Sequence, residues 1–426
     1  MYITRSLLPT LAAAAAFVST LQAQEPAAVL ANARRWVDTL ASPALHGRGY
    51  VQGGDSLAAD LIAAEFDRLG LLPVRNSRFE PFSFTVNTFP DSVKLSVDGR
   101  ALRPGIDFLV DPGSGSATGR YDLVHLRLED LATPERRAMT MGVVTGKAMA
   151  LHLPDTRNAD TLALLRDLQD DLLHHGPVLR RATGKLTWGV ARQAAPHPLL
   201  EIAQEAWNDS ATTIHLRVAN RLRNHHARNV WGLVKGRSSR QLVVVTAHYD
   251  HLGRMGPDVL FPGANDNASG VSMLLNLAAH YTRERPRYDM LFIAFAGEEA
   301  GLVGSRWCAV DRAFDLGAVK LLINLDLLGT GEEGITVVNA TAQKDVFDAL
   351  VAINTATGRL AQVKPRGPAC NSDHCPFVER GVPAIFIYTL GGIAAYHDVM
   401  DRAGTLPLTD YHDVYLTLVD LINGLK

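Results

Sequence analysis

The C-terminal half of the chain alternates strand-like and helix-like segments, and this alternation constrains the fold more than any other feature. From about residue 227 onward, short and nearly continuous apolar runs such as "LVVVTAH" and "MLFIAFAG" are separated by stretches of helical length. Strands that are apolar throughout are buried on both faces, as in a parallel sheet covered by helices. We therefore predict an α/β fold with a mostly parallel central sheet flanked by helices.

A chain of 426 residues is too long for one ordinary core, so we expect two domains. Helical periodicity runs through residues 26–72, whereas residues 88–221 consist largely of short strand-like segments around one amphipathic helix. We predict that residues 24–87 and 222–426 form the main domain. Residues 88–221 would form a small β-rich domain inserted into it.

The first 23 residues have the pattern of a signal peptide, in which Arg5 precedes an apolar run and small residues surround Ala23. No later stretch is long and apolar enough for a spanning helix, so we expect a mature chain without a stable membrane anchor, in the periplasm or outside the cell. The net charge of −2 gives no basic footprint for nucleic acid.

Two of the three cysteines, Cys370 and Cys375, bracket the short loop "CNSDHC". They are compatible with a disulfide in an oxidising compartment or with two buried thiols. Given the export signal, we predict the disulfide. Cys308 lies in an apolar, helix-like stretch and is expected in the core.

Imidazole and carboxylate groups follow the predicted strands of the main domain. They are His248, Asp250, Asp266, Glu298, Glu299, Asp326 and His397. Ligands of parallel sheets bind at the carboxyl ends of the strands, so these side chains should converge on one edge. Zinc accepts both ligand types, and a set rich in carboxylates suits a pair of metal ions that share one carboxylate.

The motifs "HYD", "GANDNASG", "EEAG", "NLD" and "YH" occur in this order within residues 243–400. This series resembles the M28 family of zinc peptidases, in particular its bacterial aminopeptidases. The opening "LHGRGYVQGGDSLAADLIAAEFDRLGL" also resembles the first helices of that family. The β-rich insert resembles the protease-associated domain that often accompanies such enzymes.

The resemblance implies a role for each site residue. One zinc ion would be held by His248, Asp266 and Glu299, and the other by Asp266, Asp326 and His397, with Asp266 bridging. Asp250 would fix the tautomer of His248. Glu298 would be the general base, which takes a proton from the attacking water and passes it to the leaving amine. The peptide bond between Asp266 and Asn267 is expected to be cis.

Other histidines need separate assignments. His374, in "SDHCPF", could donate a hydrogen bond to the developing oxyanion or brace its loop together with Asp373. We expect His251 to be a loop residue, and His225 and His226 to lie on the surface. His397 is preferred over His412 as the ligand because His412 lies inside a helical pattern.

The sequence thus predicts an exported, two-zinc aminopeptidase that acts on peptides with a free N-terminus. A glutaminyl-cyclase-like transferase is the nearest rival, although that resemblance usually goes with one zinc ion. A carboxypeptidase would need basic groups for the terminal carboxylate, for which Arg366 and Arg402 are available. A non-catalytic receptor or scaffold would be expected to have lost a ligand or the base, and none is missing.

Overall fold

The structure is a computed structural model that describes residues 26–154, 156, 158–311 and 314–426. The predicted signal peptide, residues 1–23, lies outside the described residues. Residues 26–40 are helical. Within the described ranges, no helix combines the length and the apolar character that crossing a membrane requires.

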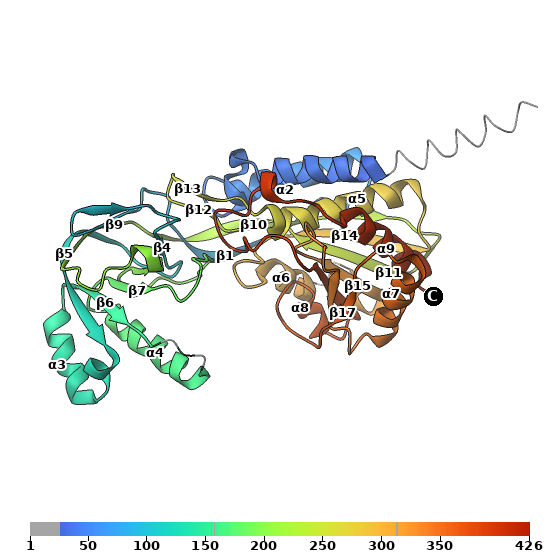
Figure 1. The fold of residues 1–426 in the computed structure, drawn as a ribbon. Helices are drawn as coiled ribbons and strands as arrows, with labels where there is room; N and C mark the ends of the chain where they lie inside the picture. The colour runs from blue at the N-terminus through green and yellow to red at the C-terminus, as the bar shows by residue number, and fades with distance from the viewer. Residues whose placement is uncertain (1–25, 155, 157, 312–313) are drawn as a thin grey trace, which may run out of the picture.

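An eight-stranded sheet forms the centre of the larger part of the molecule (Figure 1). In spatial order its strands are β1 (Phe79–Thr88), β10 (Arg221–Val234), β14 (Tyr288–Phe295), β11 (Ser238–His248), β15 (Val319–Leu325), β18 (Ala384–Thr389), β16 (Ile335–Val338) and β17 (Val363–Pro365). The inner pairs β14–β11, β11–β15 and β15–β18 are parallel, as is β16–β17. The pairs β1–β10, β10–β14 and β16–β18 are antiparallel. The predicted α/β class is confirmed, with antiparallel pairing toward the edges.

Helices cover both faces of this sheet. They are α2 (Gly54–Arg68), α5 (Gly270–Arg283), α6 (Val303–Asp311), α7 (Lys344–Thr357), α8 (Cys375–Val378) and α9 (Tyr411–Gly424). Successive side chains of a strand point to opposite faces. Accordingly, Val243 and Val245 of β11 pack in the cluster that contains α2, α5 and α9, whereas Val244 packs with residues of α6 and α8.

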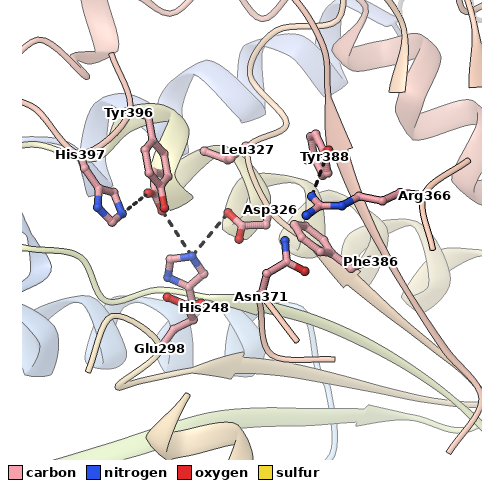
Figure 2. A pocket seen from close by; sticks show the side chains of 11 residues that line it. His248, Glu298, Asp326, Leu327, Arg366, Asn371, Phe386, Tyr388, Tyr396 and His397 are labelled. Atoms are coloured by element: carbon pink, nitrogen blue, oxygen red, sulfur yellow. Dashed lines mark hydrogen bonds and ion pairs between the residues drawn. The ribbon is translucent and has the colours of Figure 1, made fainter. Parts of the chain in front are cut away.

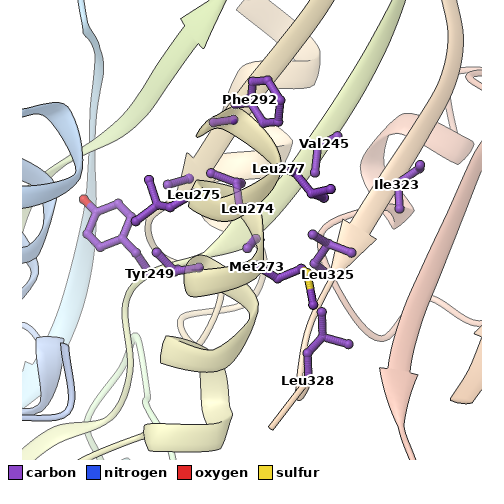
Figure 3. Packing of buried hydrophobic residues seen from close by; sticks show 14 of the residues in the cluster. Val245, Tyr249, Met273, Leu274, Leu275, Leu277, Phe292, Ile323, Leu325 and Leu328 are labelled. Carbon is purple, nitrogen blue, oxygen red and sulfur yellow. The ribbon is translucent and has the colours of Figure 1, made fainter. Parts of the chain in front are cut away.

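Helix α5 supplies the densest packing beneath the site. Its Met273, Leu274 and Leu277 are fully buried, and Figure 3 shows them over Val245 and Ile323 of the sheet. Burying one such side chain contributes roughly 1.5–3 kcal/mol. The apolar strands are therefore held rigidly, and the polar residues that follow them start from fixed positions.

A second eight-stranded sheet lies apart from the first and carries two further helices, α3 (Pro134–Val144) and α4 (Ala159–Leu172) (Figure 1). Its strands are, in spatial order, β3 (Arg100–Leu102), β2 (Lys94–Val97), β9 (Thr213–Val218), β5 (Ala117–Arg127), β6 (Ala148–His152), β7 (Val178–Arg181), β8 (Leu199–Ile202) and β4 (Phe108–Val110). The chain enters this region through β1 and returns through β10, which pair from Phe79 with Val230 to Thr88 with Arg221. We retain residues 88–221 as the proposed extent of the inserted domain.

A short hairpin of β12 (Gly253–Met255) and β13 (Val259–Phe261) joins the two parts. Its apolar residues pack in the core cluster of the second sheet, where Phe261 stacks on Trp188 with ring centroids 4.7 Å apart. The hairpin directly follows the segment that contains His248 and His251. The insert therefore has an apolar connection to a strand end of the main sheet.

One surface prediction is wrong. His225 of β10 is 5% exposed, and its Nε2 lies 2.6 Å from Asp55 Oδ2, whereas its neighbour His226 is exposed. Alternation along a strand sends adjacent residues to opposite faces, so only one of the two histidines reaches solvent.

Candidate metal centre and active site

Three neighbouring parallel strands deliver most of the predicted site residues to one edge. His248 is the last residue of β11, Asp326 directly follows β15, and the pair Glu298 and Glu299 follows β14 after a short turn. The spatial order β14, β11, β15 places His248 between the two flanking carboxylate segments. This is the edge where parallel sheets bind ligands, as the sequence predicts.

Asp266 comes from the loop before α5, and several contacts fix the backbone of this loop. The carboxylate of Asp401 accepts hydrogen bonds from the backbone N–H groups of Asn265 (2.8 Å) and Asp266 (3.0 Å). The buried guanidinium of Arg48 donates to the carbonyls of Gly263 (2.7 Å) and Asp266 (3.2 Å). The expected cis peptide bond after Asp266 is present.

The carboxylate of Asp266 lies between two histidines. Its Oδ1 is 3.3 Å from His248 Nε2, and its Oδ2 is 3.1 Å from His397 Nε2. His248 Nε2 is also 3.4 Å from Asp326 Oδ1, and His397 Nε2 is 3.3 Å from Glu299 Oε2. The possible metal ligands therefore form two groups, one around His248 and one around His397, and the carboxylate of Asp266 contacts both histidines.

The partners within these groups differ from the predicted ones. His248 meets Asp326 rather than Glu299, and Glu299 meets His397. Both β14 and β15 are neighbours of β11, so the order of motifs along the sequence leaves the partner of His248 undetermined. These contacts favour a different pairing from the predicted one, and Asp266 is present in both groups.

His251 is a site neighbour that the sequence reasoning missed. It is fully buried, and its Nδ1 lies 2.8 Å from Glu299 Oε1 and 3.9 Å from Asp266 Oδ1. His397, in contrast, is among the residues that line the adjacent pocket. His251 therefore contacts Glu299 from the side that faces away from the pocket, and it orients the Glu299 carboxylate. Its position one residue after Asp250 was the available signal.

Asp250 acts differently from the expectation. The Nδ1–H of His248 donates to the backbone carbonyl of Asp250 at 3.2 Å, while the Asp250 carboxylate is 3.8 Å away from that nitrogen. The carboxylate instead accepts from Tyr50 Oη (2.5 Å) and from the backbone N–H groups of Glu298 (3.2 Å) and Glu299 (3.3 Å). Asp250 thus fixes the His248 ring through its backbone and the glutamate turn through its side chain.

Electrostatics in this cluster favour a cation between the carboxylates. Burial alone would lower the pKa of His248, but the neighbouring Asp326 and Glu298 carboxylates raise it well above its usual range. The pKa of His397 is raised to about 11, because Glu299 and Asp266 outweigh its burial. Burial would raise the pKa of Asp266, but its two histidine contacts hold it well below normal.

The donor set fits zinc. One group comprises His248, Asp266 and Asp326, and another comprises His251, Asp266 and Glu299; within each group the ligand atoms all lie within 4.8 Å of one another. Asp326 Oδ1 is buried without a hydrogen-bond partner among the described residues. Imidazole and carboxylate donors are ordinary zinc ligands, and a shared carboxylate is typical of paired ions.

Glu298 contributes to neither group, although it lies beside them. It lines the pocket with His248 and Asp326. Burial raises the pKa of Glu298 well above its usual value, and the charges of Glu299 and Asp373 add to this, while His248 opposes it. A glutamate of this kind can hold a proton at a pH where an exposed glutamate is ionised.

The loop from Cys370 to Cys375 supports Asp326 from one side. The two cysteines form a disulfide with a Cα–Cα distance of 4.9 Å. Between them, Ser372 Oγ donates to Asp326 Oδ2 at 3.2 Å and accepts from Asn324 Nδ2 at 2.8 Å. Ser372 is a positioning residue that the sequence reasoning did not single out.

His374 of the same loop is 1% exposed, and burial lowers its pKa to about 4. Its Nε2–H donates to the carbonyl of Ala369 at 3.0 Å, and the residue is not among those that line the pocket. Of the two roles considered for His374, this contact corresponds to bracing the loop.

The insert supports the loop of His397 from the other side. The backbone N–H of Trp188 donates to the His397 carbonyl at 2.9 Å. Lys185 Nζ donates to the carbonyls of Ala394 and Tyr396, each at 2.7 Å, and to the Asp398 carboxylate at 2.8 Å. A ligand-bearing loop of the main sheet is therefore tied to the second sheet by contacts that are remote in sequence.

A pocket of about 180 Å³ opens beside the two groups. The residues that line it are His248, Asp266, Glu298, Asp326, Leu327, Arg366, Asn371, Phe386, Tyr388, Tyr396 and His397 (Figure 2). One end thus carries the carboxylates and histidines, with Tyr396 stacked on His397, and the other carries Phe386, Tyr388, an amide and a guanidinium. The pocket can hold a short substrate segment directly against Glu298.

Parts of the chain are similar to known peptidases. Residues 229–422 match peptidase family M28. A probable leucine aminopeptidase from Arthroderma otae is 30% identical over 169 residues, which cover 38% of this chain and 46% of that protein. Aminopeptidase YwaD of Bacillus subtilis is 31% identical over 179 residues, or 37% of this chain and 35% of that protein. The chain thus spans less than half the length of these curated relatives.

Among solved structures, BSAP, a zinc aminopeptidase from Bacillus subtilis, superposes with a TM-score of 0.67 at 21% identity, covering 92% of this chain and 93% of that one. A peptidase M28 precursor from Shewanella amazonensis gives 0.66 at 17% identity, covering 95% and 97%. The chain shares the fold of these proteins over nearly its whole length.

Proposed function

We propose that this protein is an exported two-zinc aminopeptidase, which hydrolyses the N-terminal peptide bond of peptides; the match of residues 229–422 to peptidase family M28 supports this. The observation that carries the proposal is the Asp266 carboxylate, which contacts a histidine with each oxygen beside the pocket that Glu298 lines. The probable leucine aminopeptidase and aminopeptidase YwaD among its relatives support the same activity.

In this proposal one zinc ion is held by His248, Asp266 and Asp326, and the other by Asp266, Glu299 and His397. When bound, two such ions polarise the scissile carbonyl and make water acidic enough to react near neutral pH. The chain's own contribution is to hold the ligands rigidly. Arg48 and Asp401 fix the loop of Asp266 through its backbone, as outer contacts of metal ligands commonly do.

Glu298 is the proposed general base. Its carboxylate takes a proton from the attacking water and then donates it to the nitrogen of the leaving amine. A base must accept and release the proton in turn, and burial raises the pKa of Glu298 well above its usual value, which helps it to hold the proton between the two steps. The N–H of Glu298 donates to Asp250, which fixes the backbone from which the side chain extends.

A free N-terminus suits the charge of the pocket. The substrate ammonium is a cation, and Glu298 is the carboxylate of the pocket lining that is not assigned to a zinc ion. An N-blocked peptide would lack this attraction. Cleavage of free-amine substrates alone therefore separates an aminopeptidase from a carboxypeptidase. Cyclisation of N-terminal glutamine would point to the transferase instead, and the scaffold alternative requires no turnover at all.

Two further parts of the proposal concern location and domain organisation. Export rests on the signal-like pattern of residues 1–23, and the disulfide between Cys370 and Cys375 is compatible with an oxidising compartment. The inserted region, residues 88–221, is proposed to be a protease-associated-like domain.

The decisive experiment compares Glu298→Gln with Glu299→Gln in the zinc-loaded protein. Glu298→Gln should keep its zinc content and lose about 10²–10⁴-fold in turnover, the usual contribution of a general base. Glu299→Gln should lose zinc as well, because it removes a charged ligand. If Glu298→Gln kept near-normal turnover while Glu299→Gln lost activity and retained its zinc, the two roles would be reversed.

A further inference from the structure

Arg366 is the one lysine or arginine among the residues that line the pocket. Figure 2 places it at the opposite end of the pocket from His397, with Asp326 between them in the view. The other charged groups of the lining are carboxylates and histidines. A single guanidinium therefore faces a space that is otherwise suited to cations.

The backbone of Arg366 is held firmly. It directly follows β17, where its N–H donates to the Val337 carbonyl (2.9 Å) and its own carbonyl accepts from Ala340 N–H (3.0 Å). The side chain is exposed, and in the described part of the chain its guanidinium makes one hydrogen bond, to Tyr388 Oη at 3.4 Å. Most of its donors thus remain available to a bound molecule.

The surroundings of Arg366 fit the end of a flexible acidic side chain. Phe386 and Tyr388 of β18 line the pocket and offer ring surfaces to the methylene groups of such a substrate side chain. Asn371 lines the same pocket with an amide. A guanidinium binds a carboxylate with two parallel hydrogen bonds, which a neutral side chain cannot reproduce. No other positive side chain of the lining competes for that carboxylate except the histidines of the proposed metal site.

We propose that Arg366 binds the side-chain carboxylate of the substrate's N-terminal residue, so that the enzyme selects peptides beginning with glutamate or aspartate. This inference rests on the proposed aminopeptidase function. The substrate's amino group and scissile bond then lie at the carboxylate end of the pocket and its side chain at the Arg366 end. The same guanidinium would bind the terminal carboxylate of a substrate if the enzyme were a carboxypeptidase.

The experiment measures kcat/KM of the zinc-loaded enzyme for glutamyl- and leucyl-nitroanilide, and the readout is the ratio of the two values. Arg366→Ala should lower this ratio about 10- to 100-fold, the equivalent of one hydrogen-bonded charged pair. Arg366→Lys should restore part of it. Lys364→Ala is the matched control, because it removes the same charge from an exposed position of β17 outside the pocket lining.

The possible results separate this inference from the proposed function. If the parent cleaves free-amine substrates but Arg366→Ala leaves the ratio unchanged, the specificity inference is overturned and the aminopeptidase stands. If N-blocked peptides with a free C-terminus are cleaved and Arg366→Ala abolishes this, Arg366 binds a terminal carboxylate and the inference is also overturned. If the parent cleaves no peptide at all, the proposed function itself fails.

Discussion

Glu80 is a buried carboxyl group far along β1 from the insert, and its titration should make stability depend on pH. It is 4% exposed, and its Oε2 accepts a hydrogen bond from Asn229 Nδ2 at 2.7 Å. Its Oε1 has no hydrogen-bond partner among the described residues. Burial raises the pKa of Glu80 from 4.5 to about 7, although the bond from Asn229 acts in the opposite direction.

The direction of the pH effect on stability depends on whether the folded state favours protonated or ionised Glu80. A raised carboxyl pKa means that the folded state prefers the protonated form, so the stabilisation is fully present below pH 4.5 and is lost as the pH rises through about 7. The difference of roughly 2.5 pKa units corresponds to about 3 kcal/mol in the free energy of unfolding. About 2.5 kcal/mol of this should be lost between pH 5 and 8.

Glu80→Gln removes the titrating group and keeps an oxygen acceptor for Asn229. Urea unfolding at pH 5 and 8, followed by tryptophan fluorescence, gives the difference in unfolding free energy between variant and parent at each pH. That difference should grow by about 2.5 kcal/mol in favour of the variant. Glu284→Gln, at an exposed site, is the control. Parallel pH curves for Glu80→Gln and the parent would refute the reasoning.

Four further outcomes are expected. Dialysis against zinc followed by metal analysis should approach two equivalents per chain, and a plateau at one with full activity would contradict the paired site. Tyr50→Phe, which removes the donor to Asp250, should lower zinc affinity about 10- to 100-fold in competition with a chelator, and an unchanged affinity would show that this bond is dispensable. Lys185→Met should lower kcat and zinc affinity together by about tenfold, since it releases the loop of His397, and normal values for both would refute that support. Cys370 and Cys375 should resist alkylation until reduced, as read by mass spectrometry, and labelling without reductant would contradict the disulfide.

The sequence predicted the strand-end residues because their signal is local. An apolar strand followed at once by His248 or Asp326 fixes both the element and the edge where the side chain lies. The sharing of Asp266 followed from the resemblance to the M28 family. Which histidine meets which carboxylate depends on the lateral order of the strands, and the alternating pattern contains no information about that order.

The residues that escaped prediction act through contacts between distant segments. Lys185 and Trp188 reach the loop of His397 across more than two hundred residues of sequence. Arg48 caps carbonyls of the Asp266 loop from the N-terminal region, and its role depends on complete burial rather than on any periodic pattern. His251 lies in a loop, as predicted, but its burial against Glu299 depends on neighbours in space that the sequence pattern does not show.

Because β1 pairs antiparallel with β10, the chain segment that forms the second sheet could be replaced by another module. Thr88 and Arg221 face each other across the pair, so the chain departs and re-enters at positions one strand spacing apart, a gap that a two-residue turn can close. Another module grafted between these residues would leave the register of the main sheet untouched. The graft would contact the edge that carries His248 and His397 only if it replaced the packing of the β12–β13 hairpin on the insert and the hydrogen bonds of Lys185 and Trp188. A series of such chimaeras, with and without those donors, would measure how much the insert contributes to holding the loop of His397 in place.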